Sequence, residues 1–205
     1  MDRPLELMDW KRRVAAMYAA VREGDGDPEA VQAFRRGKDA LFAGHPQSPL
    51  PEDRRAAFTG LPYFPHDPAW RVAAHLEPEP DGPELVIPTS TGEPTRFLRV
   101  GFVSPVLGGA AVRLAVYWLQ GYGGGVFLPF RDALAGRQTY GGGRYLLDTV
   151  KGADLGTAGD GALVLDFNMA FNPSCAYDPR WSCPLAPPEN VLDIAVTAGE
   201  MAPGA

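Results

Sequence analysis

The chain has 205 residues and a net charge of −6, and 45% of its residues are hydrophobic, as in an ordinary soluble globular protein. The acidic balance argues against general affinity for nucleic acid, which requires a basic surface. The 24 glycines and 21 prolines favour many turns and short strands over a bundle of helices.

No stretch of the sequence has the apolar length of a membrane span, and charged residues interrupt the apolar residues near the N-terminus. Two cysteines are too few for the disulfide framework of a secreted domain. We therefore expect a cytoplasmic protein that does not bind membranes.

The first predicted element is an amphipathic helix over residues 5–23. Leu7, Trp10 and Val14 recur at spacings of three and four residues, which places them on one helix face. A Gly-Asp-Gly turn at residues 24–26 ends this helix.

A second helix is predicted over residues 28–43. Asp27 can cap free N–H groups with its side chain, and Pro28 is tolerated at the first helical position. Lys38 lies inside the apolar stripe of this helix. Such a lysine either extends its tip to water or points into a pocket, and both interpretations stay open. A short helical turn is predicted after Pro51.

After Pro65 the apolar pattern changes from a helical period to alternation, which is typical of strands. The predicted strands cover residues 70–76, 98–102, 112–118, 126–130, 144–147, 162–167 and 192–196, with residues 78–84 as a loop and 201–205 as a tail. Gly108 and Gly109 predict a hairpin turn between the second and third of these strands.

These elements predict a mainly β, α+β fold: an antiparallel β-sandwich or barrel-like sheet with an N-terminal pair of helices packed on it. The apolar runs are too short to serve as crossover helices between parallel strands. We assign residues 1–45 to an N-terminal helical extension and residues 46–205 to a β-rich core domain.

Glycine, aromatic and polar residues are concentrated in two segments of the last third of the chain. These are YGGGRY at residues 140–145 and DFNMAFNPSCAY at residues 166–177. Loops of this composition on a rigid scaffold are where proteins place binding and catalytic groups. The two segments therefore predict the location of a site.

With further blocks such as GLPYFP at residues 60–65 and FLPFRD at residues 127–132, the chain resembles a bacterial and archaeal family known as domain of unknown function 1684. The resemblance runs from about residue 34 to residue 200. Phe171 stands where many relatives have tyrosine, which removes one hydroxyl. The resemblance implies a family identity and carries no activity.

Arg144 follows three glycines at residues 141–143. Glycines permit close backbone approach, so their N–H groups could form a nest for an anion, and Arg144 would add a fixed fork of donors. The alternative is a tight turn ahead of a strand, with Arg144 at the surface.

Asp166 ends an apolar strand, and Asn168 is expected on the same strand face. A carboxylate at a buried strand end requires a partner, for which Arg144 and Arg71 are the candidates. If Asp166 faces a pocket it would serve as a general base. Alternatively, it accepts hydrogen bonds from loop N–H groups, as the neighbouring asparagines would.

Cys175 and Cys183 lie in the same region. Zinc is disfavoured because a site would need two more ligands and the histidines are far away in sequence. A disulfide is unexpected in a reducing cytosol, so we expect both thiols to be reduced and free of metal. Cys175 would be a nucleophile if a base lies close, and the alternative is two buried, inert thiols.

The sequence thus predicts a site for a small polar, anionic metabolite, with no cofactor and no metal. Asp166 would be the general acid or base, Arg144 the anion clamp and Cys175 the nucleophile of a hydrolysis or an elimination. The predicted ligand-binding residues are Arg71, Tyr140, Gly142, Asn168, Asn172 and Tyr177. The alternatives are a non-catalytic binding or sensing module, and an interaction protein that forms a homodimer or docks on a partner through its N-terminal helices.

Overall fold

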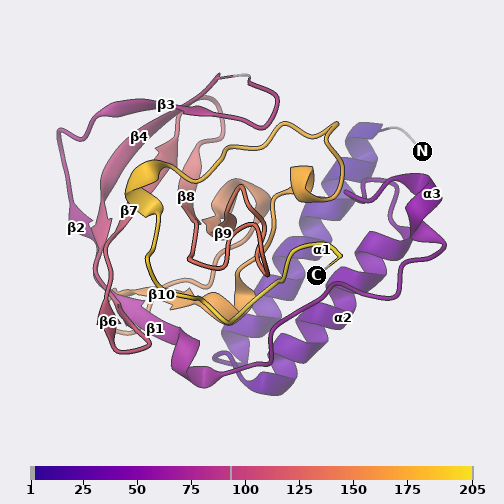
Figure 1. The fold of residues 1–205 in the computed structure, drawn as a ribbon, viewed down its shortest axis with the longest axis horizontal. Helices are drawn as coiled ribbons and strands as arrows, with labels where there is room; N and C mark the ends of the chain where they lie inside the picture. Colours follow the sequence, from indigo (N-terminus) through magenta and orange to yellow (C-terminus); the bar gives the residue numbers. More distant parts are fainter. Residues whose placement is uncertain (1–2, 93, 205) are drawn as a thin grey trace.

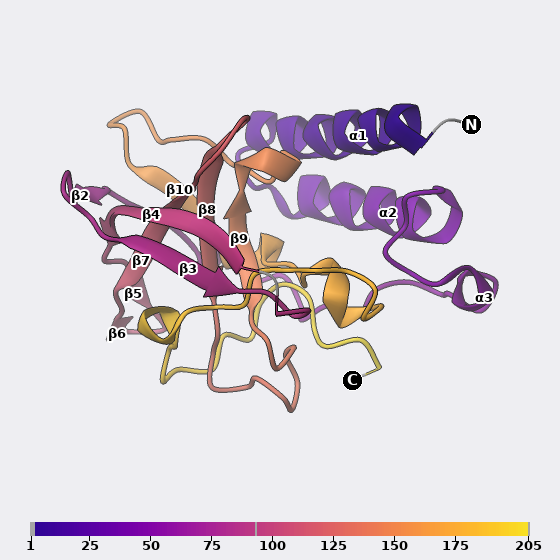
Figure 2. The same cartoon turned by 90° about the horizontal axis from the view of Figure 1, so that it is seen from above.

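The computed structural model describes residues 3–92 and 94–204. Helices α1 (Arg3–Glu23) and α2 (Pro28–Gly44) lie side by side and form a layer against the β-rich part of the molecule (Figures 1 and 2). The Asp27 carboxylate caps α2 by accepting a hydrogen bond of 3.1 Å from the N–H of Glu29. The predicted pair of helices is confirmed, as is the short turn α3 (Glu52–Arg55).

The strands of the described residues form one large sheet and two small ones. The large sheet has the order β2-β4-β7-β8-β9, with β3 also paired to β4. Its members are β2 (Glu77–Pro78), β3 (Glu84–Pro88), β4 (Pro94–Val103), β7 (Leu114–Leu119), β8 (Gly125–Phe130) and β9 (Arg144–Asp148). The small sheets pair β1 (Arg71–Ala74) with β10 (Leu163–Asp166), and β5 (Val106–Leu107) with β6 (Ala110–Ala111).

All of these ladders are antiparallel, which confirms the predicted mainly β, α+β fold with helices packed on it. Gly108 and Gly109 have φ values of 55° and 82° and turn the β5–β6 hairpin, as their sequence predicts. Short 3₁₀ helices connect the remaining segments: η1 (Pro68–Trp70), η2 (Thr149–Lys151), η3 (Phe167–Met169), η4 (Ser174–Ala176) and η5 (Pro188–Asn190).

Three local predictions are wrong. Residues 192–196 are not a strand; their backbone bonds instead to the loop after β8, where the N–H of Leu192 donates to Arg131 at 2.7 Å. The predicted loop 78–84 includes the ends of β2 and β3, and flanking prolines hid β3. Trp70 lies in η1 because the Asp67 carboxylate caps that turn.

Two apolar clusters hold the layers together. The main core lies between the large sheet and the β1–β10 pair and includes Leu128, Leu165 and Phe167. A second cluster joins the helices to the β-rich part, since Tyr18 and Phe34 pack with side chains of residues 153–169. The helices and the β-rich part thus share one apolar cluster. The division of the chain into two domains between residues 45 and 46 stays a prediction.

Two further features bear on partners. Among the described residues, none of the helices combines the length and apolar character needed to cross a membrane. Leu5, Leu7 and Met8 are exposed at the N-terminal end of α1. A homodimer through the N-terminal helices stays a prediction.

Candidate functional site

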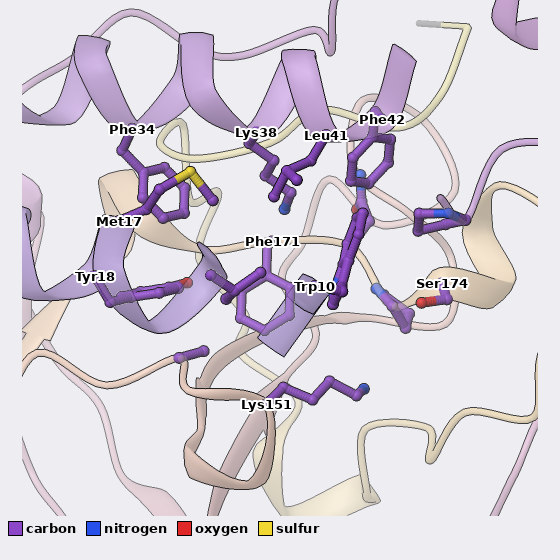
Figure 3. A pocket seen from close by; sticks show the side chains of 15 residues that line it. Trp10, Met17, Tyr18, Phe34, Lys38, Leu41, Phe42, Lys151, Phe171 and Ser174 are labelled. Atoms are coloured by element: carbon purple, nitrogen blue, oxygen red, sulfur yellow. The ribbon is translucent and has the colours of Figure 1, made fainter. Parts of the chain in front are cut away.

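A pocket opens between α1, α2 and the segment that follows η3 (Figure 3). Its cavity volume is about 80 Å³, and the open mouth adds further space. The walls are mainly apolar: Trp10, Val14 and Met17 of α1, Phe34, Leu41 and Phe42 of α2, and Phe171 and Pro173. The apolar stripes of the two helices therefore face this cavity as well as the core, which is typical of ligand pockets.

Lys38 is the charged side chain that α2 extends toward Phe171 in the pocket (Figure 3). Its side chain is only 12% exposed, and its Nζ lies 5.0 Å from the ring centroid of Phe171 and 5.5 Å from that of Phe42. It forms an ion pair with the Glu200 carboxylate. Of the two interpretations that the sequence leaves open for this lysine, the pocket is the one observed.

Glu200 is 1% exposed and has four hydrogen-bond donors around its carboxylate. Its Oε1 accepts from Lys38 and, at 3.4 Å, from the Tyr63 hydroxyl. Its Oε2 accepts from the N–H of Asn172 and from the Tyr177 hydroxyl, both at 2.8 Å. A buried carboxylate with this set of donors is satisfied in its charged form.

The two tyrosines keep their hydroxyl protons for this carboxylate. Burial, and to a lesser extent the charge of Glu200, raises the pKa of Tyr63 and of Tyr177 well above their usual range. Both hydroxyls therefore act as neutral donors at physiological pH. The site thus combines the Lys38 cation, the Glu200 anion and neutral donors behind an apolar entrance. Lys151 is a second cation in the lining, 47% exposed and paired with Asp148 at 3.1 Å (Figure 3).

Long-range backbone contacts place Glu200. Gly199 has φ of 75°, and a Cβ there would lie 2.6 Å from the carbonyl oxygens of Phe167 and Ala170. The N–H of Glu200 donates to Ala170 at 2.9 Å, and the N–H of Phe64 donates to Gly199 at 3.0 Å. The close approach that only glycine permits therefore sets the carboxylate between two loops.

Asn172 is part of the wall of the pocket. Its Nδ2 donates to the Met201 carbonyl at 2.7 Å and to the Tyr177 hydroxyl at 3.3 Å. Its Oδ1 is buried without a hydrogen-bond partner, and the residue lines the pocket. A buried polar atom left unpaired is costly, and this oxygen is closed to solvent as well.

Arg144 is not the partner of Asp166; of the two candidates from the sequence, Arg71 is the one that pairs with it. Its guanidinium is 1% exposed and donates to the carbonyls of Val196, Ala198 and Glu200 at 3.0, 2.5 and 2.9 Å. Its ion-pair partner is Asp132 at 3.5 Å. Burial lowers the pKa of Arg144 to about 10, an effect that Asp132 opposes. Arg144 therefore stabilises the position of the C-terminal segment that contains Glu200 and does not itself line the pocket.

Asp166, Asn168 and Arg71 form a separate structural group. Asp166 is fully buried and accepts from the N–H and the Nδ2 of Asn168, each at 2.9 Å. Asn168 also joins the backbone of Asp67 through bonds of 2.8 and 3.0 Å. Arg71 pairs with Asp166 at 3.4 Å and with Asp25 at 2.8 Å. These bonds tie loops to β10, which is the alternative that the sequence left open.

Three further residues predicted for the site do not line this pocket: Tyr140, Gly142 and Cys175. The glycines form a tight turn ahead of β9, in which the N–H of Gly143 donates to Tyr140 at 3.0 Å. The Tyr140 hydroxyl lies 3.7 Å from the Cys175 sulfur, and Cys175 and Cys183 are free thiols. Among residues 3–92 and 94–204, no cluster of three or more potential metal ligands occurs.

Only part of this site could be predicted from the sequence. Asn172 and Tyr177 were predicted and lie at it, whereas Glu200 and Tyr63 were missed. The usable signal was the position of Lys38 within an apolar stripe. Glu200 has no local signal, because its place depends on contacts with residues far away in sequence.

The model of the family described as protein of unknown function (DUF1684) matches residues 56–201. The chain belongs to this family. The match contains Tyr63, Asn172, Tyr177 and Glu200, whereas Lys38 precedes it.

A solved structure is similar over almost its full length. It is the solution NMR structure of an uncharacterized protein of Haloarcula marismortui, with 36% identity and a TM-score of 0.62. The similarity covers 88% of this chain and 97% of that one. No curated protein matches the chain. The relationship to DUF1684 thus gives the family and the fold.

Proposed function

We propose that this chain binds a small molecule with an apolar body and an anionic group in the pocket between α1 and α2. The observation that supports this most directly is the position of the Lys38 ammonium group. The Lys38 side chain is only 12% exposed and lies among largely apolar pocket walls. An anion in such a place interacts with the cation more strongly than it would in water, since the local dielectric constant is low. The apolar walls suit the remainder of the ligand.

Lys38 has capacity for this anion although it already contacts Glu200. An ammonium has three protons, and the ion pair with Oε1 of Glu200 uses one of them. The Glu200 carboxylate in turn has Tyr63, Tyr177 and the N–H of Asn172 as further donors. The carboxylate therefore does not require the whole ammonium group.

Lys38 and the apolar walls define the ligand class. A carboxylate attached to an alkyl or aromatic body satisfies the ammonium and the walls together.

Binding is favoured over the hydrolase or lyase activity considered from sequence. Arg144 and Asp166 do not share a cavity, and Arg144 has backbone carbonyls and Asp132 as its partners. Glu200 is enclosed by donors and is therefore poorly placed to remove a proton from a ligand.

Calorimetry with decanoate and 1-decanol as matched probes tests the proposal. Both probes have the same apolar chain, and only decanoate has the charge that Lys38 would recognise. We expect decanoate to bind at least roughly tenfold more tightly, with quenching of tryptophan fluorescence because Trp10 lines the pocket. Equal affinities for the two probes, or binding of neither, would contradict the proposal.

Variants locate the binding to this pocket. In the double variant Lys38→Met with Glu200→Gln, both charges are removed together, so no unpaired carboxylate is left buried. We expect it to lose the preference for decanoate. Glu200→Gln alone should bind decanoate more tightly than the wild type, because the internal counter-charge is gone. Lys11→Met, on the exposed side of α1, is the matched control and should bind as the wild type does.

A further inference from the structure

Cys175, Cys183 and Tyr140 form a second constellation, independent of the pocket. The N–H of Cys175 lies 3.4 Å from the Cys183 sulfur, and the Tyr140 hydroxyl lies 3.7 Å from the Cys175 sulfur. Cys175 is 9% exposed and Cys183 is 3% exposed. The two thiols therefore adjoin one another, and Cys175 is the more accessible of them.

The backbone holds this arrangement. Cys175 lies in η4, between Ser174 and Ala176. The segment of Cys183 is fixed to the residues after β3, since its N–H donates to the Ser90 hydroxyl at 3.1 Å and its carbonyl accepts from the N–H of Ser90 at 2.9 Å. The proximity of the thiols thus depends on two fixed segments.

The surroundings make the two thiols unequal. The hydrogen bond from the Cys183 thiol lowers the pKa of Cys175 to about 6, against the effect of burial, and the Tyr140 hydroxyl adds to this lowering. The neighbouring Cys175 raises the pKa of Cys183. Burial is the main cause that raises the pKa of Tyr140 to about 12, so this residue keeps its proton. The donors around Cys175 therefore favour its thiolate form over that of Cys183.

We propose that Cys175 is a thiolate that reduces hydrogen peroxide, with Cys183 as the thiol that resolves the product. In the first step the Cys175 sulfur attacks one peroxide oxygen. An S–O bond forms, the O–O bond breaks, and the leaving hydroxide takes a proton from solvent or through Tyr140 to become water. Cys175 is then a sulfenic acid.

In the second step the Cys183 sulfur attacks the Cys175 sulfur. The S–S bond forms, the S–O bond breaks, and the departing hydroxide takes the proton that Cys183 releases. Two thiols and one hydrogen peroxide thus give one disulfide and two waters. A small dithiol reductant returns both cysteines to thiols by exchange.

The partial burial of Cys175 selects the oxidant. Cys175 is only 9% exposed as a residue, so a small oxidant such as hydrogen peroxide is favoured over a bulky aromatic disulfide reagent. An apolar surrounding raises the pKa of a thiol and makes it inert. The surroundings of Cys175 differ, because hydrogen-bond donors lie next to its sulfur.

The test uses the full chain, reduced with dithiothreitol, freed of reductant and treated with equimolar hydrogen peroxide. We expect the intact mass to fall by about 2 Da and to be restored by dithiothreitol. Cys183→Ser should instead form a sulfenic acid that dimedone traps at Cys175. Cys175→Ser should react at least roughly tenfold more slowly. Tyr140→Phe should slow the first step and leave the disulfide as the product.

The proposal is overturned if the wild type keeps both thiols, if the disulfide joins two chains, or if Cys175→Ser consumes peroxide at the wild-type rate. Circular dichroism of each variant checks that it is folded. The mass measurement on the wild type needs no variant, so it decides the question even if a substitution prevents folding. Binding of decanoate is a separate measurement, and either proposal can fail without the other.

Discussion

Arg144 donates a hydrogen bond of 2.9 Å to the main-chain carbonyl of Glu200, whose side chain forms the ion pair with Lys38. Arg144 therefore positions the pocket residue Glu200 through the backbone of the C-terminal segment, without contacting the pocket itself. Three carbonyls of that segment converge on its guanidinium. The position of the Glu200 carboxylate thus depends on a buried cation that does not touch the pocket.

Arg144→Ala should strongly destabilise the fold. The substitution leaves the Asp132 carboxylate without its cation and three carbonyls without their donor, so we expect the free energy of unfolding to fall by about 3–5 kcal/mol. Denaturant titration measures the change. Arg137→Ala is the control, because Arg137 is exposed and should change stability by less than about 0.5 kcal/mol. Wild-type stability of Arg144→Ala would contradict the assigned role.

Lys38 and Glu200 should be strongly coupled in a double-mutant cycle. Lys38→Met alone leaves a carboxylate that is 1% exposed without its cation, which should cost about 3–5 kcal/mol. Adding Glu200→Gln removes the stranded charge and should recover most of this loss. Chemical denaturation of the four proteins gives the coupling energy. Additive effects would show that the two side chains do not interact in solution.

The helices and most strands could be predicted because their signals are local. The three- and four-residue spacing of Leu7, Trp10 and Val14 and the Asp27 cap defined the helices without any knowledge of the rest of the fold. The strand predicted at residues 192–196 was wrong because the apolar side chains of this segment face the core, whereas its backbone forms only single hydrogen bonds and no ladder. An alternating pattern reports burial and does not by itself report a ladder.

The site was harder to predict because charge partners are chosen by tertiary contacts. Asp166 required a partner, and Arg71, one of the two candidates from the sequence, is the one observed. The partner of Arg144 is Asp132, which the sequence did not indicate. Glu200 lies 162 positions from Lys38 in sequence, in a segment with no periodic pattern. Nothing local distinguishes such a carboxylate from a solvated one.

Gly199→Ala should weaken the site and the fold together. The new Cβ would lie 2.6 Å from two carbonyl oxygens, at a φ of 75° that an alanine adopts only with strain, so we expect a loss of about 1–3 kcal/mol or more. Differential scanning calorimetry measures it. Gly44→Ala is the control, since a Cβ at Gly44 meets nothing within 4 Å and the residue ends α2. Equal melting temperatures of the two variants would exclude tight packing at Gly199.

Tyr177 should make the fold sensitive to alkaline pH. Burial raises the pKa of this tyrosine, as it does for Tyr18, Tyr63 and Tyr145. When pH rises past about 10, the unfolded chain loses tyrosine protons that the folded chain retains. The unfolded state then binds fewer protons, so stability falls as pH rises, and the stabilisation is fully present only below that pH.

Tyr177→Phe removes one of these protons from the difference. Its stability should therefore decline with pH less steeply than that of the wild type, by up to about 1.4 kcal/mol per pH unit above pH 10, although the lost hydrogen bond to Glu200 lowers its stability at neutral pH. Urea titrations between pH 8 and about 11 measure both quantities. Tyr122→Phe, at a fully exposed position, serves as the control and should follow the wild-type curve. The same slope for Tyr177→Phe and the wild type would mean that the Tyr177 hydroxyl is not buried against the Glu200 carboxylate in solution.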